Sequence, residues 1–172
     1  MGLAQLWLPT FDPKPQWIRR AERAIRRALE LDPGNADAHC ARGRLLWSPA
    51  KGFQHRAAFR ALRQALNLNP GCYQARLWTG VVMQHVGLLE EAKEETAAVL
   101  ATNLDDVFTL HSAGHTAHFV GNYDEAQEYY ARVLAIEPSH LWANIFLPAS
   151  PLYAGDLQLA EEKIREIGRA HV

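Results

Sequence analysis

Apolar residues recur at helical spacing along most of this chain. In one stretch, Val107, Leu110 and Ala117 stand three and seven positions apart, as residues on one face of an α-helix do. Gly121 interrupts the pattern, which then resumes and ends at Pro138, because proline cannot continue a helix interior. The stretch is therefore predicted to form two amphipathic helices joined by a tight turn.

The same hairpin recurs at a nearly constant interval along the chain. One step is longer than the others, because the turn from Trp47 to Phe53 contains three additional positions. The residues that share this register are small ones at Ala21, Ala58, Ala92, Ala126 and Ala160, glycines at Gly43, Gly80 and Gly114, turn glycines at Gly87, Gly121 and Gly155, and prolines at Pro33, Pro70 and Pro138, with Leu104 in the remaining proline position.

A single hairpin of this size cannot bury its own apolar faces, so its copies are expected to stack. Small residues fit where two helices cross closely, and the glycine turns reverse the chain between helices. The sequence therefore predicts an all-α fold, a right-handed superhelical solenoid of stacked antiparallel helix pairs with a concave and a convex surface.

This pattern resembles the tetratricopeptide repeat, a helix–turn–helix unit of about 34 residues. The resemblance runs from about Ile18 to the C-terminus, and the first aromatic position of the family pattern is not aromatic in any copy. The residues that match best are Leu110, Ala113, Gly114, Ala117, Ala126, Tyr130 and Pro138. The resemblance implies a scaffold that binds proteins or peptides.

The register also predicts the domain organisation. Residues 1–16 form a leading segment, interpreted as the tail of a truncated repeat helix or as a short natural cap, and the region is expected to be excised from a larger protein. The solenoid covers 17–172, with a helix at 17–31 and repeats at about 36–70, 73–104, 107–138 and 141–170.

The last repeat departs from the pattern. Pro148 and Pro151 are expected to end or kink the helix that begins near Ser139. The following helix, 156–168, is expected to turn four residues inward, namely Leu157, Ala160, Ile164 and Ile167. No polar capping helix follows, which favours an excised piece or an end that pairs with another copy.

Composition and motifs exclude several classes of function. A net charge of −1 gives no field that would attract nucleic acid, and no run approaches the ~20 apolar residues of a membrane span. The start of the chain does not match a signal peptide, and Cys40 and Cys72 are expected to be free thiols of a cytoplasmic protein. No phosphate-binding loop or catalytic motif occurs, so neither an enzyme nor a cofactor is expected.

The first helix of each pair is expected to line the concave groove, where an unidentified protein or peptide would bind. Relatives that clamp a peptide C-terminus carry Lys and Asn at certain groove positions. This chain has other residues at those positions, including Arg44 and His111. The predicted groove residues are Arg44, Trp47, Leu77, Val81, Gln84, His85, Phe108, His111, His115, His118, Phe119 and Trp142.

Three of these residues, His111, His115 and His118, share one helical face. Two neighbouring imidazoles could ligate one metal ion, with a third ligand from a residue such as His85. We expect a polar stripe that contacts a ligand, and no native metal site. Two alternatives to the scaffold stay open: a structural module that self-associates through its uncapped end, and a small-ligand or metal binder that uses the histidine stripe.

Overall fold

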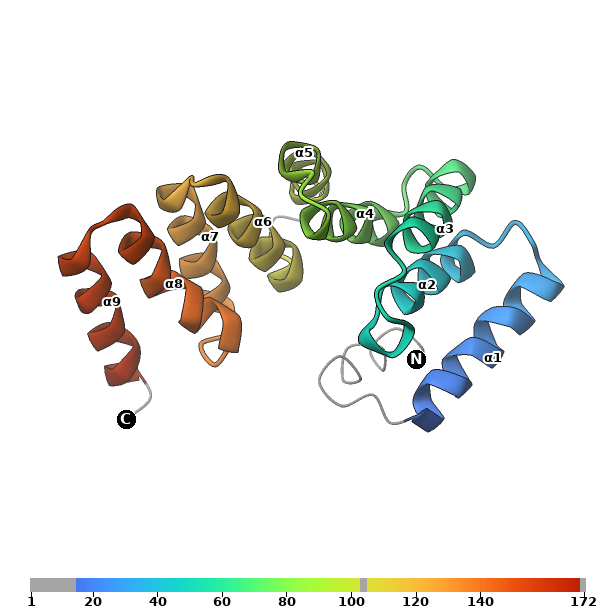
Figure 1. Ribbon diagram of the computed structural model, residues 1–172, viewed down its shortest axis with the longest axis horizontal. Coiled ribbons are helices and arrows are strands. Elements are labelled where there is room, and N and C mark those ends of the chain that lie inside the picture. Colours follow the sequence, from blue (N-terminus) through green and yellow to red (C-terminus); the bar gives the residue numbers. More distant parts are fainter. Residues whose placement is uncertain (1–14, 103–104, 171–172) are drawn as a thin grey trace. The chain divides into compact units, whose positions relative to one another are not determined.

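The computed structural model describes residues 15–102 and 105–170, and it describes side chains as far as Gly168. These residues form helices and turns, with no β-strand among them (Figure 1). The helices are α1 (Pro15–Leu31), α2 (Ala36–Leu46), the short 3₁₀-helix η3 (Pro49–Lys51), α3 (His55–Leu68), α4 (Tyr73–His85), α5 (Leu89–Leu100), α6 (Val107–Val120), α7 (Tyr123–Ile136), α8 (Leu141–Ala154) and α9 (Leu157–Ala170).

The chain divides into two compact units, Met1–Val86 and Gly87–Val172. The first unit contains α1 to α4 and the second contains α5 to α9. The predicted leading segment lies mostly outside the described residues; Pro15 and Gln16 are the first two residues of α1.

In the first unit, α2 and α3 form an antiparallel pair against which α4 packs. Gly43 allows this close crossing, because a Cβ built on it would lie 2.6 Å from Leu62 Cγ. Three buried alanines complete the contact, and the thiols of two free cysteines lie in the same core. The buried residues of this cluster are Cys40, Ala58, Leu62, Ala65, Cys72, Ala75 and Val82.

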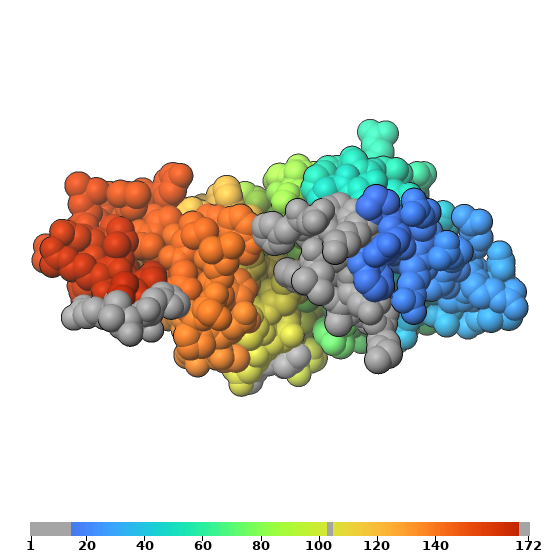
Figure 2. All heavy atoms as spheres, turned by 90° about the horizontal axis from the view of Figure 1, so that it is seen from below, coloured from blue at the N-terminus to red at the C-terminus, as the bar shows by residue number. Residues whose placement is uncertain are grey.

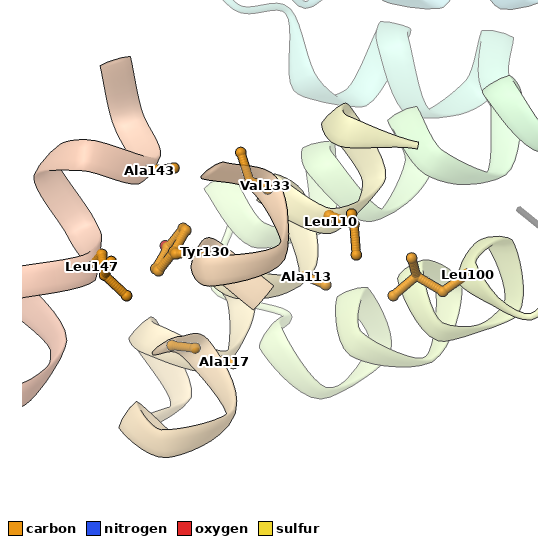
Figure 3. Packing of buried hydrophobic residues seen from close by; sticks show 9 residues of the cluster. Leu100, Leu110, Ala113, Ala117, Tyr130, Val133, Ala143 and Leu147 are labelled. Carbon is orange, nitrogen blue, oxygen red and sulfur yellow. The ribbon is translucent and has the colours of Figure 1, made fainter. Parts of the chain in front are cut away.

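In the second unit, each helix packs on the next one along the chain, from α5 to α9. The core is centred on Tyr130 of α7, which is fully buried and points toward Leu147 of α8 (Figure 3). Its ring stacks on Phe146 with the centroids 5.7 Å apart. The ring also packs against Gly114 of α6, whose lack of a Cβ makes room for it.

The repeat register is visible in the backbone. Ala58, Ala92 and Ala126 are fully buried where helices pack, as the small-residue pattern predicts. The turn glycines Gly87, Gly121 and Gly155 have φ values of 84°, 91° and 87°, in the left-handed region that favours glycine. The proline position occupied by Leu104 lies outside the described residues.

The longer turn in the first unit is built around η3. Gly52 and Phe53 both have positive φ, at 65° and 50°. Trp47 packs against Phe53 with the ring centroids 5.5 Å apart, so the longer turn folds back onto the end of α2.

The prediction that two prolines break the first helix of the last repeat is wrong. Helix α8 runs unbroken through Pro148 and Pro151. Each proline removes one N–H donor, but α8 is held on both sides by α7 and α9, and Pro151 is buried in this packing. Tertiary packing therefore outweighs the local preference of proline.

The prediction for α9 is partly wrong. Ala160 is buried, but Leu157 and Ile164 are 67% and 60% exposed. Figure 2 shows α9, in red, at the surface of the second unit. Among the described residues, no further helix follows α9 to cover these two side chains.

Candidate binding surfaces

The predicted groove residues fall into two sets, one in each unit. In the first unit, three of them are buried: Arg44 on α2 and the pair Leu77 and Val81 on α4. Trp47 and Gln84 are half-buried and His85 is exposed. Leu77 and Val81 are thus closed to a partner, contrary to what their repeat positions suggest.

Arg44 packs against an aromatic cluster in the first unit. Its guanidinium carbon lies 4.6 Å from the ring centroid of Trp78. Trp47 contacts both Trp78, at 5.7 Å between centroids, and His85, at 4.6 Å. Burial lowers the pKa of His85, and the nearby His55 lowers it further. We define the Arg44 cluster as Arg44, Trp47, Trp78 and His85.

In the second unit, the two predicted aromatic anchors lie at the surface. Phe119 at the end of α6 is 56% exposed, and Trp142 at the start of α8 is 39% exposed. Both rings contact the half-buried Phe146, with centroids 6.5 Å and 6.3 Å from it. Phe146 thus joins the two anchors into one apolar surface.

Other residues of α8 extend this surface. Besides Trp142, the exposed large side chains of α8 are Leu141, Ile145, Leu152 and Tyr153. We define the aromatic surface as Phe119, Trp142, Ile145, Phe146, Leu152 and Tyr153. Sequence reasoning left Leu152 and Tyr153 out, although each stands one repeat period after a predicted groove residue, His118 and Phe119. The expected proline break at this point concealed the match.

The histidines of the second unit do not form an exposed stripe. His118 is buried, and its Nδ1 lies 3.0 Å from Ser150 Oγ. Ser150 Oγ donates its hydrogen to the Phe146 carbonyl oxygen, so the His118 ring donates Nδ1–H to Ser150. Burial lowers the pKa of His118. This histidine ties α6 to α8.

His111 is also largely enclosed. Its ring centroid lies 5.0 Å from that of His140 and 6.0 Å from that of His115. Its Nε2 atom is buried without a hydrogen-bond partner. Burial, together with the neighbouring His140 and His115, lowers the pKa of His111 to about 3. His111 is therefore a neutral packing residue near pH 7, while Phe108 and His115 are half-buried.

Two further observations concern metal and membrane. In the described part of the chain, no three His, Cys, Asp or Glu side chains lie close enough to hold one metal ion. Among the same residues, none of the helices combines the length and the apolar character required to cross a lipid bilayer.

The stacked helix pairs define this chain as a helical-repeat protein. Two family models, each described as tetratricopeptide repeat, match residues 18–48 and 109–140. The chain therefore contains tetratricopeptide repeats at these residues, and the resemblance drawn from the sequence is confirmed there. No curated protein matches the chain.

Solved structures share the fold at low sequence identity. A structure of PilW, described as a widely conserved type IV pilus biogenesis factor, has a TM-score of 0.78 and 22% identity over 99% of this chain and 78% of its own. A crystal structure of MamA has a TM-score of 0.74 and 18% identity over 90% of this chain and 88% of its own. Pseudomonas aeruginosa PilF has a TM-score of 0.73 and 16% identity over 98% of this chain and 75% of its own. These matches confirm the predicted all-helical repeat fold.

Proposed function

We propose that this chain is a scaffold module that binds a protein or peptide, without catalysis, through the groove side of its repeats. The observation that carries the proposal is the aromatic surface of the second unit. Phe119 and Trp142 both contact Phe146, yet more than a third of each residue is exposed. Exposed aromatic side chains on a rigid support are typical anchors of protein interfaces.

The sequence register supports one continuous repeat array. The equal spacing of Ala58, Ala92 and Ala126 after the longer turn crosses the boundary between the two units without a change. We include the whole range 17–172 in the proposed scaffold for this reason. A cytoplasmic location is part of the same proposal, and the free thiols of Cys40 and Cys72 support it.

The proposal is tested by selecting peptides from a random display library on the full chain. Selected peptides are then measured against the double variant Phe119→Ser with Trp142→Ser. Loss of binding is expected, because each anchor typically contributes more than ~1 kcal/mol. The matched control is Ile136→Ser on α7. It removes an exposed apolar side chain of the same unit that is not part of the aromatic surface. Equal binding by the double variant and wild type would refute the use of this surface.

A second candidate function rests on α9. Leu157 and Ile164 are exposed on a helix whose apolar side is otherwise buried only at Ala160. A second copy of the chain would cover them, which corresponds to the self-associating module predicted from the sequence. Analytical ultracentrifugation should then show a mass that rises with concentration, and Ile164→Glu should abolish the rise. A monomer at all concentrations would exclude this candidate.

The histidine-based alternative has less support. His118 is buried, with its Nδ1 hydrogen-bonded to Ser150, and the Nε2 of His111 is enclosed without a partner. Zinc titration of the full chain followed by calorimetry remains the direct test of a metal-binding function.

A further inference from the structure

A cleft lies between α1 and α2 in the first unit. Side chains of both helices line it, together with Lys51 of η3 and Gln54 just before α3. Its volume is about 520 Å³. Pockets that hold small molecules are typically about 300–1,000 Å³ in volume, so this cleft has the size of a small-ligand site.

Four aliphatic side chains line the cleft, two from each helix. They are Ile25 and Leu29 of α1 and Leu45 and Leu46 of α2. Leu45 is buried, but the other three are only half-buried. Ile18 is the one described residue of α1 that is buried, so the rest of this helix leaves part of its apolar face open to the cleft. An aliphatic ligand would remove this surface from water, which is favourable.

Both carboxylates that line the cleft already have a cationic partner. Glu22 of α1 forms an ion pair with Lys51, which links α1 to η3. Glu30, near the end of α1, lies 3.5 Å from an Nη atom of Arg27. The acidic side chains of the cleft are therefore not free to attract a cationic ligand.

The two arginines that line the cleft lack such a partner. Arg26 of α1 and Arg42 of α2 are exposed, and within residues 15–102 and 105–170 neither forms an ion pair. Guanidinium groups donate hydrogen bonds and cannot accept them. Both arginines are therefore available to the charged group of an anion.

The charge of the whole first unit also favours an anion. Met1–Val86 contains 13 Lys and Arg against 5 Asp and Glu, a net charge of +8. Gly87–Val172 contains 5 against 14, a net charge of −9. The overall charge of −1 thus conceals a strongly cationic unit, and a cleft in such a unit raises the local concentration of anions.

We propose that the cleft between α1 and α2 binds a small amphiphilic anion. Its aliphatic part lies against the four apolar side chains, and its anionic head is held by Arg26 and Arg42. The anion of a medium-chain fatty acid is the simplest molecule of this class. A small inorganic anion would leave the apolar side chains in water, and a neutral hydrocarbon would make no use of the two guanidinium groups. The site goes beyond the proposed scaffold function and involves no residue of the aromatic surface.

The test is an NMR titration of the full chain, labelled at its isoleucine methyl groups, with sodium octanoate and separately with octanol. The Ile25 methyl resonance, assigned from Ile25→Val, should shift saturably with octanoate. Octanol, which has the same chain without the charge, should bind about tenfold more weakly or less. The methyl resonance of Ile145, which belongs to the aromatic surface, should stay in place over the same range of concentration.

Variants of the two arginines test the anionic head. Arg26→Gln and Arg42→Gln should each weaken octanoate binding severalfold, and the double variant by about tenfold or more. The matched control is Arg23→Gln, which removes an exposed arginine of the same helix that does not line the cleft. It lowers the charge of the unit equally and should leave the affinity unchanged.

Four outcomes overturn the inference. They are no saturable shift of Ile25, equal affinity for octanoate and octanol, a shift of Ile145 with the same affinity, and an equal loss of binding in Arg23→Gln and Arg26→Gln. The comparison of octanoate with octanol uses the wild-type chain, so it decides the role of charge even if a variant fails to fold. Because the readout is Ile25, a negative result leaves the aromatic surface to be judged by its own variants.

Discussion

Gly114 of α6 and the ring of Tyr130 of α7 are in direct contact. A Cβ built on Gly114 would lie 2.9 Å from Tyr130 Cε1, and the same ring stacks on Phe146. Gly43 and Leu62 form the equivalent contact in the first unit. The two partners are further apart in sequence there, by the same three positions that lengthen the turn between α2 and α3.

This contact predicts that Gly114→Ala destabilises the protein. Overpacking of a filled core typically costs about 1–3 kcal/mol, and the gain in helix propensity returns about 1 kcal/mol. Gly114→Leu should cost more. The control is Gly168→Ala on α9, where an added Cβ meets no atom within 4 Å, so stability should not fall. Urea unfolding followed by circular dichroism measures all three, and an unchanged midpoint for Gly114→Leu would contradict the packing described.

A second prediction concerns the prolines inside α8. Pro148→Ala restores an N–H that can bond to the Asn144 carbonyl, and interior proline costs a helix about 3 kcal/mol. We therefore expect a higher thermal midpoint, with a smaller gain for Pro151→Ala because Pro151 is buried and its ring contributes packing. A lower midpoint for Pro148→Ala would show that its ring also fills space that alanine leaves empty.

A third prediction concerns pH. The folded protein keeps His111 neutral, with its pKa lowered to about 3, whereas the unfolded chain takes up a proton below about pH 6.5. The free energy of unfolding should therefore be largest above pH 6.5 and should fall as the pH drops toward 3. Protonation linked to His111 alone should lower the free energy of unfolding by up to about 2 kcal/mol between pH 7 and pH 5. The lowered pKa of His118 acts in the same direction.

His111→Gln should remove part of this pH dependence, and His39→Gln on α2 is the comparison in the first unit. The measurement is the midpoint of urea unfolding at several values of pH between 5 and 8. The same slope for wild type and His111→Gln would show that His111 does not carry the effect.

A fourth prediction uses the two thiols as a probe of the first unit. Cys40 and Cys72 are buried, and the pKa of Cys40 is raised to about 12, so both should react slowly with Ellman's reagent at pH 8. Gly43→Ala should speed the reaction, since the added Cβ would lie 2.6 Å from Leu62 Cγ and loosen the contact of α2 with α3. Immediate reaction of the wild-type thiols would be inconsistent with the structure.

The repeat fold could be predicted from the sequence because its signals are local. Glycine at a turn, such as Gly121, and alanine at a helix crossing, such as Ala126, are required by backbone geometry at those positions. The exposure of the site residues depends on distant neighbours. Periodicity places Leu77 on a helix face without showing that it is buried, and it does not show that Ile164 lacks a covering helix among the described residues.

Two other features were also beyond sequence reasoning. The continuity of α8 at Pro148 depends on tertiary packing rather than on local preference. The cleft between α1 and α2 emerges only when the packing of both helices is known.

We propose that the aromatic surface of α6 and α8 binds a partner peptide. The most direct test of this proposal is chemical-shift mapping with a peptide selected on the full chain. The indole N–H of Trp142 and the amides around Phe119 and Tyr153 should shift during titration, while the amides around Ile136 on α7 should not. Shifts confined to α7, with Trp142 unaffected at saturation, would contradict it.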